Sequence, residues 1–414
     1  MNSNSDNGRQ TRGAEGHRRL AVVIVNYNVK YYTEQCLRSL RKALEGIDGG
    51  VYVIDNHSKD GSVEYLKERF PEVTFIASSH NLGFARANNI VIRQTDSDYV
   101  LLLNPDTIVG ESVLRECVAF MDTHEKAGAL GVCMQRIDGK PAMESRRGLP
   151  TPMAALYKIC GLCARYPESR RFGKYYMSYL PWDKPAKIEV VSGAFSFLRR
   201  AALDKTGLLD EEYFMYGEDI DLSYRLLKAG FDNWFLPSVI LHYKGESTVK
   251  TSFRYVHVFY QAMLIFIRKH YGHLHFWVTL PIEAAIYCKA TAALFNMAAE
   301  RARKSLGFTD IRRPQYALYV FICRADTLRE CRRIALSNGL EARFMEGDER
   351  TMPDGHCSFD CAADGKTTYV VYDTSAFSYS KILSFFAARP CGSVFIGTYD
   401  PQTGKVITPS DVFQ

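Results

Sequence analysis

Short apolar runs alternate with helical spacing along the first hundred residues. Leu20–Val25, Val51–Ile54, Val73–Ala77 and Val100–Leu103 are apolar or β-branched enough to be strands, and the last of them can be buried on both faces of a parallel sheet. Between the first two runs, apolar residues recur at helical spacing over Tyr31–Leu44. Strands that alternate with helices predict right-handed crossovers and an α/β fold.

Three of these runs end in polar clusters: Asn26–Asn28, Asp55 with the turn after it, and Asn104–Asp106. The carboxyl edge of an open α/β sheet is where such folds bind ligands. Because Pro105 prevents further ladder pairing, Asp106 is expected at a strand end. A carboxylate there can hold a divalent cation that in turn binds phosphate oxygens. An ordinary strand-ending turn is the alternative, and it becomes less favourable because three such clusters occur together.

A second group of strands is expected further along the chain. Glu189–Arg199 is apolar enough to be a strand, and Gly193 within it permits close approach of another backbone. Two shorter strands, Trp234–Leu236 and Val239–His242, are expected after it. A lone histidine is usually structural, but His242 at a strand end is placed to reach a metal.

The stretch Tyr213–Gly230, YFMYGEDIDLSYRLLKAG, predicts a helix whose first turn carries Glu218, Asp219 and Asp221. The helix dipole favours acids there, so capping is one explanation. The dipole also lowers the pKa of a carboxylate, which keeps a base ionised. The other explanation is therefore that one acid faces a substrate hydroxyl, and both stay open at this point.

The composition is that of a globular protein with two or three domains: 414 residues, 47% apolar and 24% charged. A net charge of +6 without a long basic run argues weakly for an anionic substrate or membrane surface, and against a dedicated nucleic-acid binder. The eleven scattered cysteines predict reduced thiols in the cytoplasm. Residues 1–19 are polar, which predicts a disordered tail.

The sequence lacks the phosphate-binding loops that two enzyme classes with related folds require. The turn after the first strand, NYNVKYY, has no G-x-G-x-x-G, so a dinucleotide-dependent oxidoreductase is disfavoured. The same turn lacks the glycine-rich loop with Arg or Lys that a sugar nucleotidyltransferase needs to hold a triphosphate.

Seven blocks follow one another between residue 20 and about residue 250. They are VVIVNYN, VIDNHSKDGS, NLGFARANN, LLLNPDT, VSGAF, FMYGEDIDLSYRLLKAG and HYKGES. With these blocks the chain resembles the family 2 glycosyltransferases, and most of all the rhamnosyltransferase group of bacterial surface-polysaccharide enzymes. The resemblance implies the GT-A fold, an α/β nucleotide-sugar-binding fold on a mostly parallel sheet. It also implies a nucleotide-sugar donor, Mg or Mn as cofactor, and inversion at the anomeric carbon.

The resemblance assigns roles to individual residues. Asp219 would be the general base and Glu218 would orient the acceptor. Asp106 would bind the metal together with His242. Asn104 departs from the acid that most often begins the family's D-x-D motif, which removes one charge. The residues that would line the nucleotide-sugar site are Asn26, Tyr27, Asn28, Asp55, Asn81, Gly83, Arg86, Asn104, Asp106 and Gly193.

Two further segments follow the catalytic region at residues 20–250. Residues 251–310 are typical of long helices with aromatic and basic side chains. These suit either an interfacial helix on an anionic leaflet or a helical pair packed on the catalytic domain or in a dimer. Residues 311–414 alternate strands and helices and predict a small α/β domain without a catalytic constellation. Our hypothesis is that this domain is a regulatory or partner-docking module.

The function that the resemblance implies is transfer of a sugar, with rhamnose as the first choice, in cell-surface glycan biosynthesis. The donor would be dTDP- or UDP-linked, and the acceptor a polyprenyl-linked saccharide or a polysaccharide. Such an enzyme would be cytoplasmic or peripheral on the cytoplasmic face of the inner membrane, and a homodimer is left open. The alternative is a non-catalytic saccharide-binding or scaffold subunit on the same fold. Against that alternative stand four residues retained together: Asp55, Asp106, Asp219 and His242.

Overall fold

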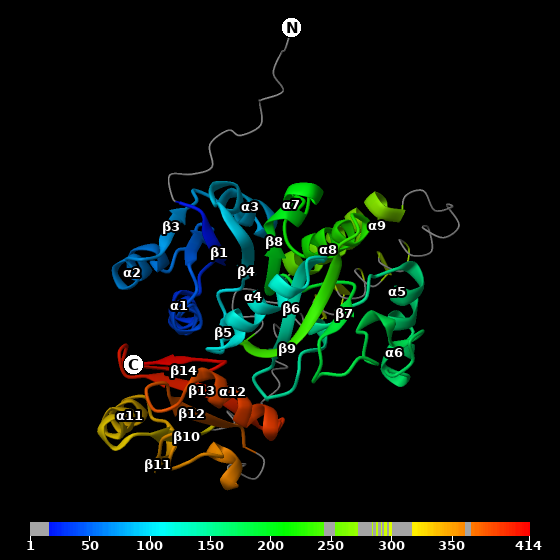
Figure 1. The fold of residues 1–414 in the computed structure, drawn as a ribbon. Coiled ribbons are helices and arrows are strands. Elements are labelled where there is room, and N and C mark those ends of the chain that lie inside the picture. The colour runs from blue at the N-terminus through cyan, green and yellow to red at the C-terminus, as the bar shows by residue number, and fades with distance from the viewer. Residues whose placement is uncertain are drawn as a thin grey trace.

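The computed structural model describes residues 16–243, 253–271, 317–360 and 366–414, with isolated positions between 284 and 299 (Figure 1). Most of the expected tail at residues 1–19 lies outside this range, but its last two residues were assigned wrongly. Arg18 and Arg19 belong to the first strand, because their backbone pairs with neighbouring segments and Arg19 forms an ion pair with Asp98. Most of the expected helical segment at residues 251–310 lies outside the described residues.

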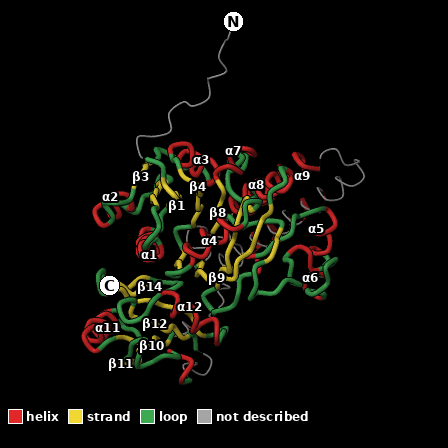
Figure 2. Tube along the Cα trace, in the orientation of Figure 1, coloured by secondary structure: helices red, strands yellow, loops and turns green. Residues whose placement is uncertain are grey.

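The catalytic region is built on a nine-stranded sheet in the order β3-β2-β1-β4-β8-β6-β9-β5, with β7 paired to β9 (Figure 2). The first four strands are parallel, as expected, whereas β8, β5 and β7 run antiparallel to their neighbours. The strands are β1 (Arg18–Asn26), β2 (Gly49–Asp55), β3 (Thr74–Ala77), β4 (Ser97–Leu103), β5 (Thr107–Val109), β6 (Ala127–Gln135), β7 (Ala186–Ile188), β8 (Phe195–Arg199) and β9 (Asp232–His242).

Strand β4 is buried on both faces, as its apolar run predicts. Leu101 and Leu103 pack into one core with α1, α2 and α4, whereas Val100 and Leu102 pack into a second core with α3, α7 and α8. Each of these four side chains is at most 1% exposed, so β4 lies at the centre of the sheet. The helices are α1 (Lys30–Ala43), α2 (Ser62–Arg69), α3 (Phe84–Gln94), α4 (Val113–Thr123), α5 (Pro152–Ile159), α6 (Leu162–Arg165), α7 (Arg200–Thr206), α8 (Glu218–Lys228) and α9 (Phe253–Tyr271).

Two strand predictions were wrong in their bounds. The run Glu189–Arg199 is a strand only over its second half, because a turn at Gly193 precedes β8. The two short strands expected before His242 are one strand, β9. The ladder between β6 and β9 shifts register so that Pro237, which has no N–H to donate, is passed over.

The C-terminal domain is a second α/β unit with a six-stranded sheet in the order β11-β10-β12-β13-β14-β15. Its first four strands are parallel and match the sequence prediction, whereas the short antiparallel β14 and β15 were not predicted. The elements are β10 (Leu318–Cys323), α11 (Ala325–Ser337), β11 (Glu341–Glu346), β12 (Thr368–Asp373), α12 (Tyr379–Ala388), β13 (Val394–Asp400), β14 (Lys405–Ile407) and β15 (Val412–Phe413).

Helix α1 of the catalytic domain covers the carboxyl edge of this second sheet. Gln35 Nε2 donates to Thr398 Oγ1 at 2.5 Å, and Arg38 Nε lies 3.1 Å from Asp400 Oδ2. Tyr32 belongs to an apolar cluster formed mainly by C-terminal residues. An open α/β sheet usually binds its ligand at the carboxyl edge. In the C-terminal sheet this edge, at the end of β13, instead contacts the catalytic domain.

Glu111 of the catalytic domain contacts the C-terminal domain by capping the first turn of α12. Its carboxylate accepts the backbone N–H groups of Tyr379 at 2.7 Å and Ser380 at 2.8 Å. Burial alone would raise the pKa of Glu111, but these hydrogen bonds outweigh it and hold the pKa below its ordinary value. The carboxylate thus satisfies helix N–H groups that have no partner within α12.

We expect Glu111→Gln to lower the free energy of unfolding by about 1 kcal/mol at pH 7, because an amide can accept only one of the two N–H groups well. The pKa of Glu111 is lowered in the folded state, so its contribution to the free energy of unfolding is present above the ordinary pKa of 4.5. This contribution is lost as the pH falls through the lowered pKa. Denaturant unfolding at pH 7 and below pH 4 measures both effects. Glu64→Gln, in the exposed first turn of α2, is the control, and an equal loss in both variants would contradict the capping role.

Candidate active site

The polar ends of β1 and β2 form one hydrogen-bonded group. Asn26 and Asp55 are in register, and Asn26 Nδ2 donates to Asp55 Oδ1 at 2.7 Å. Thr33 Oγ1 donates to the other side of the Asn26 amide at 2.7 Å, and Ser58 N donates to Asp55 Oδ2 at 2.8 Å. Asn26 and Asp55 are both at most 4% exposed, so this edge is fixed before any ligand arrives.

A second group links β2 to the loop before α3. Asn56 Nδ2 donates to Asn81 Oδ1 at 3.0 Å, and Asn56 Oδ1 accepts the Leu82 N–H at 2.7 Å. Gly83 follows with φ +78°, and a Cβ added there would lie 2.3 Å from the carbonyl oxygen of Phe214. The loop at Asn81–Gly83, which is predicted to line the nucleotide pocket, therefore packs against the segment before α8.

We expect Gly83→Ala to lower the free energy of unfolding by about 3 kcal/mol, because it combines a left-handed backbone with a clash against a backbone oxygen. Gly207→Ala is the matched control, since Gly207 (φ +82°, ψ +166°) shares the backbone conformation of Gly83 (φ +78°, ψ −176°) and a Cβ added there would meet Arg225 Nη1 at an ordinary 3.7 Å. Urea unfolding of the two variants separates the clash from the backbone strain. Equal losses would show that the contact with Phe214 adds nothing.

Asn104, Asp106 and His242 come together at the carboxyl end of β4. Asp106 Oδ1 lies 3.4 Å from His242 Nε2, and the Asn104 amide nitrogen lies 3.3 Å from the same imidazole atom. The antiparallel pairing of β5 with β9 sets this geometry, since Thr107 is opposite His242 and Tyr243 N donates to Asp106 O. Asp106 is 1% exposed.

The donor set of this cluster fits a divalent cation held together with a diphosphate. A carboxylate, an imidazole and an amide are ligands that Mn²⁺ or Mg²⁺ accepts, the first and last through oxygen. His242 Nδ1 is buried without a hydrogen-bond partner among the described residues. Within the same residues no group of three His, Cys, Asp or Glu side chains could hold a metal.

Asp219 of α8 contacts a partly buried arginine, Arg147. Arg147 donates a short hydrogen bond to Asp219 Oδ2, which also accepts the Gly193 N–H at 3.2 Å. Although burial disfavours the guanidinium charge, the Asp219 carboxylate holds the pKa of Arg147 above its ordinary value. A Cβ added at Gly193 would touch Phe84 at an ordinary 3.5 Å, so packing within the protein does not by itself demand glycine.

Glu218, beside Asp219, is 5% exposed, and its Oε2 atom has no hydrogen-bond partner among the described residues. Burial, and then the neighbouring Asp219 charge, raises the pKa of Glu218 to about 8. At neutral pH Glu218 therefore carries a proton. The site therefore holds Asp219 in an ion pair with Arg147 and, next to it, an acid whose pKa is raised.

We expect Glu218→Gln to become more stable than the wild type as the pH rises from about 5 to about 8. Between the ordinary pKa of 4.5 and about 8 the unfolded chain has released the Glu218 proton and the folded protein has not, so wild-type stability falls with pH. The difference should grow by roughly 1.4 kcal/mol per pH unit in this window. Unfolding at pH 5, 6.5 and 8 tests it, with Glu45→Gln on the exposed surface as control. A difference that does not change with pH would refute the shift.

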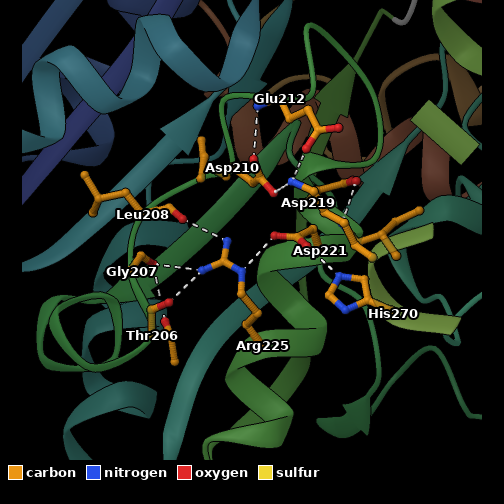
Figure 3. Close-up of polar contacts among 12 residues, drawn as sticks. Thr206, Gly207, Leu208, Asp210, Glu212, Asp219, Asp221, Arg225 and His270 are labelled. Carbon is orange, nitrogen blue, oxygen red and sulfur yellow. Dashed lines mark hydrogen bonds and ion pairs between the residues drawn. The ribbon is translucent and has the colours of Figure 1, made fainter. Parts of the chain in front are cut away.

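The third acid of α8 has a structural role. Asp221 Oδ2 accepts from Arg225 Nε at 2.7 Å, and Asp221 Oδ1 lies 2.6 Å from His270 Nε2 of α9 (Figure 3). Arg225 also donates to three backbone carbonyl groups, those of Thr206, Gly207 and Leu208. The contacts with Arg225 and His270 therefore explain Asp221, whereas Asp219 on the same turn is held toward Arg147.

The second half of helix α9 packs on the catalytic domain. Lys269 forms ion pairs with Asp210 and Glu212, and Arg268 pairs with Glu212. Phe266 and Ala262 pack in a cluster with Tyr213, just before α8. Of the two roles left open for the helical segment, α9 has the packed one, because its basic residues meet carboxylates of the catalytic domain.

One turn connects the metal-type cluster to the acids of α8. Asn104 N donates to Ala194 O at 2.9 Å, and the preceding residue, Gly193, donates to Asp219. The VSGAF block therefore brings the carboxyl end of β4 and the first turn of α8 to one place. Segments between residues 104 and 242 converge there on a carboxylate–imidazole pair and a carboxylate–guanidinium pair.

Three of the predicted site residues lie at the margin of this group. Asn28 is exposed, has φ 55°, and uses its side chain to accept the Lys59 N–H at 2.7 Å. Arg86 is exposed, with its Nε 3.8 Å from Glu211 Oε2. Tyr27 is partly exposed beside Asn26. These side chains are available to a ligand, but no contact fixes them toward the other two clusters.

Comparison with known proteins decides the family. Residues 17–257, more than half of the chain, match the family model described as glycosyltransferase like family 2. The chain belongs to this family. The fold class expected from the sequence is confirmed as well: an α/β catalytic domain of the GT-A type, followed by helices and a small α/β domain.

The relatives of this glycosyltransferase include rhamnosyltransferases. The N-acetylglucosaminyl-diphospho-decaprenol L-rhamnosyltransferase of Mycobacterium tuberculosis is 29% identical over 278 residues, which cover 64% of this chain and 88% of that protein. The rhamnosyltransferase WbbL of Escherichia coli is 24% identical, over 56% of this chain and 88% of its own. Among solved structures, the mannosyltransferase PcManGT of Pyrobaculum calidifontis, in complex with GDP-Man and Mn²⁺, is 16% identical with a TM-score of 0.42, covering 74% of this chain and 85% of its own.

Sequence reasoning missed two residues that the structure places at this site. Arg147 lies between β6 and α5, outside the seven blocks that carry the family resemblance. His270 lies at the end of α9, where basic residues suggested a membrane surface instead of an anchor for Asp221. None of the helices, as far as the chain is described, is both long and apolar enough to cross a bilayer.

Proposed function

We propose that this family 2 glycosyltransferase transfers a sugar, rhamnose in the first instance, from a dTDP- or UDP-linked donor to a lipid-linked saccharide, with inversion at the anomeric carbon. The observation that carries the proposal is the convergence at Gly193 and Ala194. There the Asp106–His242 pair and the Asp219–Arg147 pair are joined through two adjacent residues. The similarity to a rhamnosyltransferase named for a decaprenol-linked acceptor supports the same choice of donor and acceptor.

The donor would bind along the carboxyl ends of β1, β2 and β4. Asp55, held by Asn26 and Ser58, keeps free lone pairs for the ribose or base. The backbone between Asn81 and Gly83 would line the nucleotide, since Asn56 fixes it from behind. Asp106 and His242 would hold a divalent cation, Mg or Mn, which offsets charge developing on the departing diphosphate.

Asp219 would accept the proton of the acceptor hydroxyl. As the acceptor oxygen forms its bond to the anomeric carbon, the bond from that carbon to the diphosphate breaks, and the diphosphate leaves with the electron pair. Arg147 and the Gly193 N–H hold the Asp219 carboxylate in position. Glu218, protonated at neutral pH, can donate a hydrogen bond to the acceptor.

The test is calorimetric titration of the full chain with dTDP- and UDP-linked sugars, first with Mn²⁺ and then with a chelator. Metal-dependent binding of one donor supports the proposal and names the sugar. Absence of binding to every donor, by protein that unfolds cooperatively, would overturn it and favour the non-catalytic saccharide-binding or scaffold subunit.

A further inference from the structure

Three exposed apolar side chains lie close together on the segment that follows the Arg147 turn. Met153 is 51% exposed, Leu156 47% and Tyr166 48%. Met153 and Leu156 are one turn apart on α5, so they share a face of that helix. Large apolar side chains are exposed at seven positions among the described residues, and three of the seven fall within these fourteen residues. Such a concentration indicates an interaction surface, unlike scattered single residues.

Basic side chains surround this apolar group. From Met153 to Tyr175 the sequence has five Lys or Arg residues and one acid, Glu168. Four of the five are exposed and form no ion pair with a carboxylate in the part of the chain that the structure describes: Lys158, Arg165, Arg170 and Arg171. Lys158 instead lies over the Tyr175 ring, 3.6 Å from its centroid. This combination of exposed apolar and unneutralised basic residues complements an anionic lipid surface.

The same segment is tied to the acceptor side of the active site. Gly148 N donates to Tyr175 O at 3.0 Å, and a Cβ at Gly148 would lie 2.3 Å from Lys174 O. Glu189 joins these two segments, since its carboxylate accepts the Leu149 N–H at 2.6 Å and lies 3.2 Å from Lys174 Nζ. Arg147, which holds Asp219, is the residue directly before Gly148. Both ends of the segment that carries α5 and α6 are therefore joined beside the residue that holds the proposed base.

We propose that this α5–α6 surface docks the protein on an anionic lipid leaflet, so that a lipid-linked acceptor reaches Asp219 from that side. The choice of a lipid leaflet as occupant rests on the proposed function. Apolar side chains would enter the interface while the basic ones meet headgroup phosphates. The docking residues are Met153, Leu156, Lys158, Arg165, Tyr166, Arg170 and Arg171.

The experiment is co-flotation of the full chain with vesicles of phosphatidylglycerol and phosphatidylcholine, compared with vesicles of phosphatidylcholine alone. Two double variants remove the surface: Met153→Asp with Leu156→Asp, and Arg165→Glu with Arg170→Glu. The matched controls are Leu336→Asp and Arg329→Glu on α11, where Leu336 is 86% exposed. Figure 1 places α11 far from α5 and α6, in the C-terminal domain.

We expect wild type and controls to float with the anionic vesicles only, and both double variants to lose at least about tenfold in partitioning. Failure of the wild type to float, or unchanged flotation of both double variants, would overturn the proposal. So would a change in oligomeric state of the variants by light scattering without a change in flotation, since that assigns the surface to a second copy. Calorimetric donor binding by the same variants is read separately, so a failed function and a failed docking surface give different results.

Discussion

Asp219→Asn should lower turnover by roughly a hundred- to ten-thousandfold while leaving donor binding nearly intact, as loss of a general base does. Asparagine keeps the shape of the side chain and can still accept from Arg147 and Gly193, but it cannot take a proton from the acceptor. Initial rates with a saccharide acceptor, together with calorimetric donor binding, measure the two quantities apart.

Asp221→Asn is the matched control, because Asp221 lies on the same turn of α8 but is bonded to Arg225 and His270. This variant should lose stability and keep most of its turnover per folded molecule. Removing the negative charge of either acid leaves a buried partner less well paired, so the unfolding free energy of both variants must be measured alongside the rates. Wild-type turnover in Asp219→Asn would remove Asp219 from the mechanism.

Asp106→Ala should weaken metal-dependent donor binding by at least about a hundredfold, since it removes the one carboxylate of the β4 cluster. Binding that remains should no longer respond to a chelator, because His242 and Asn104 alone hold a cation poorly. Titration of the donor with Mn²⁺ and with chelator gives both values. The rate with a saturating donor is a separate quantity and is not needed for this test.

Asp98→Ala is the control at the other end of the same strand, where Asp98 pairs with Arg19 on the surface. It should leave donor binding unchanged. If Asp106→Ala bound donor as tightly as Asp98→Ala, with the same sensitivity to chelator, the cluster of Asn104, Asp106 and His242 would not be the metal site. A strand-ending turn would then be the better account of Asp106.

The C-terminal domain has a structural connection that its sequence did not suggest. Helix α1, whose first residues follow the polar end of β1, also contacts Thr398 and Asp400 of the second sheet. Glu111, just after β5, caps α12. The domain thus contacts α1 and the segment after β5, two elements next to the proposed donor site. If the domain is regulatory, its effect on that site would pass through these elements.

Local patterns predicted a large share of the fold. The apolar run of β4, its stop at Pro105 and the polar ends of β1 and β2 are all contained in a few consecutive residues. Burial on two faces and the position of strand ends follow from such runs, because strand geometry repeats every two residues and proline cannot continue a ladder. Strand bounds failed where a turn at Gly193 or a register shift opposite Pro237 interrupted the pattern.

The sequence by itself predicted the family, which comparison confirmed, and it predicted the carboxyl edge as the site together with the acids that lie there. Only the tertiary structure decided what those acids contact. Arg147 is 72 positions from Asp219, and Glu111 is 269 positions from Ser380. Residue spacing carries information over a turn of helix or a few strand residues, whereas these contacts depend on how whole elements pack. Burial raises the pKa of Glu218 to about 8. For the same reason this burial could not be predicted from the presence of three acids in the first turn of α8.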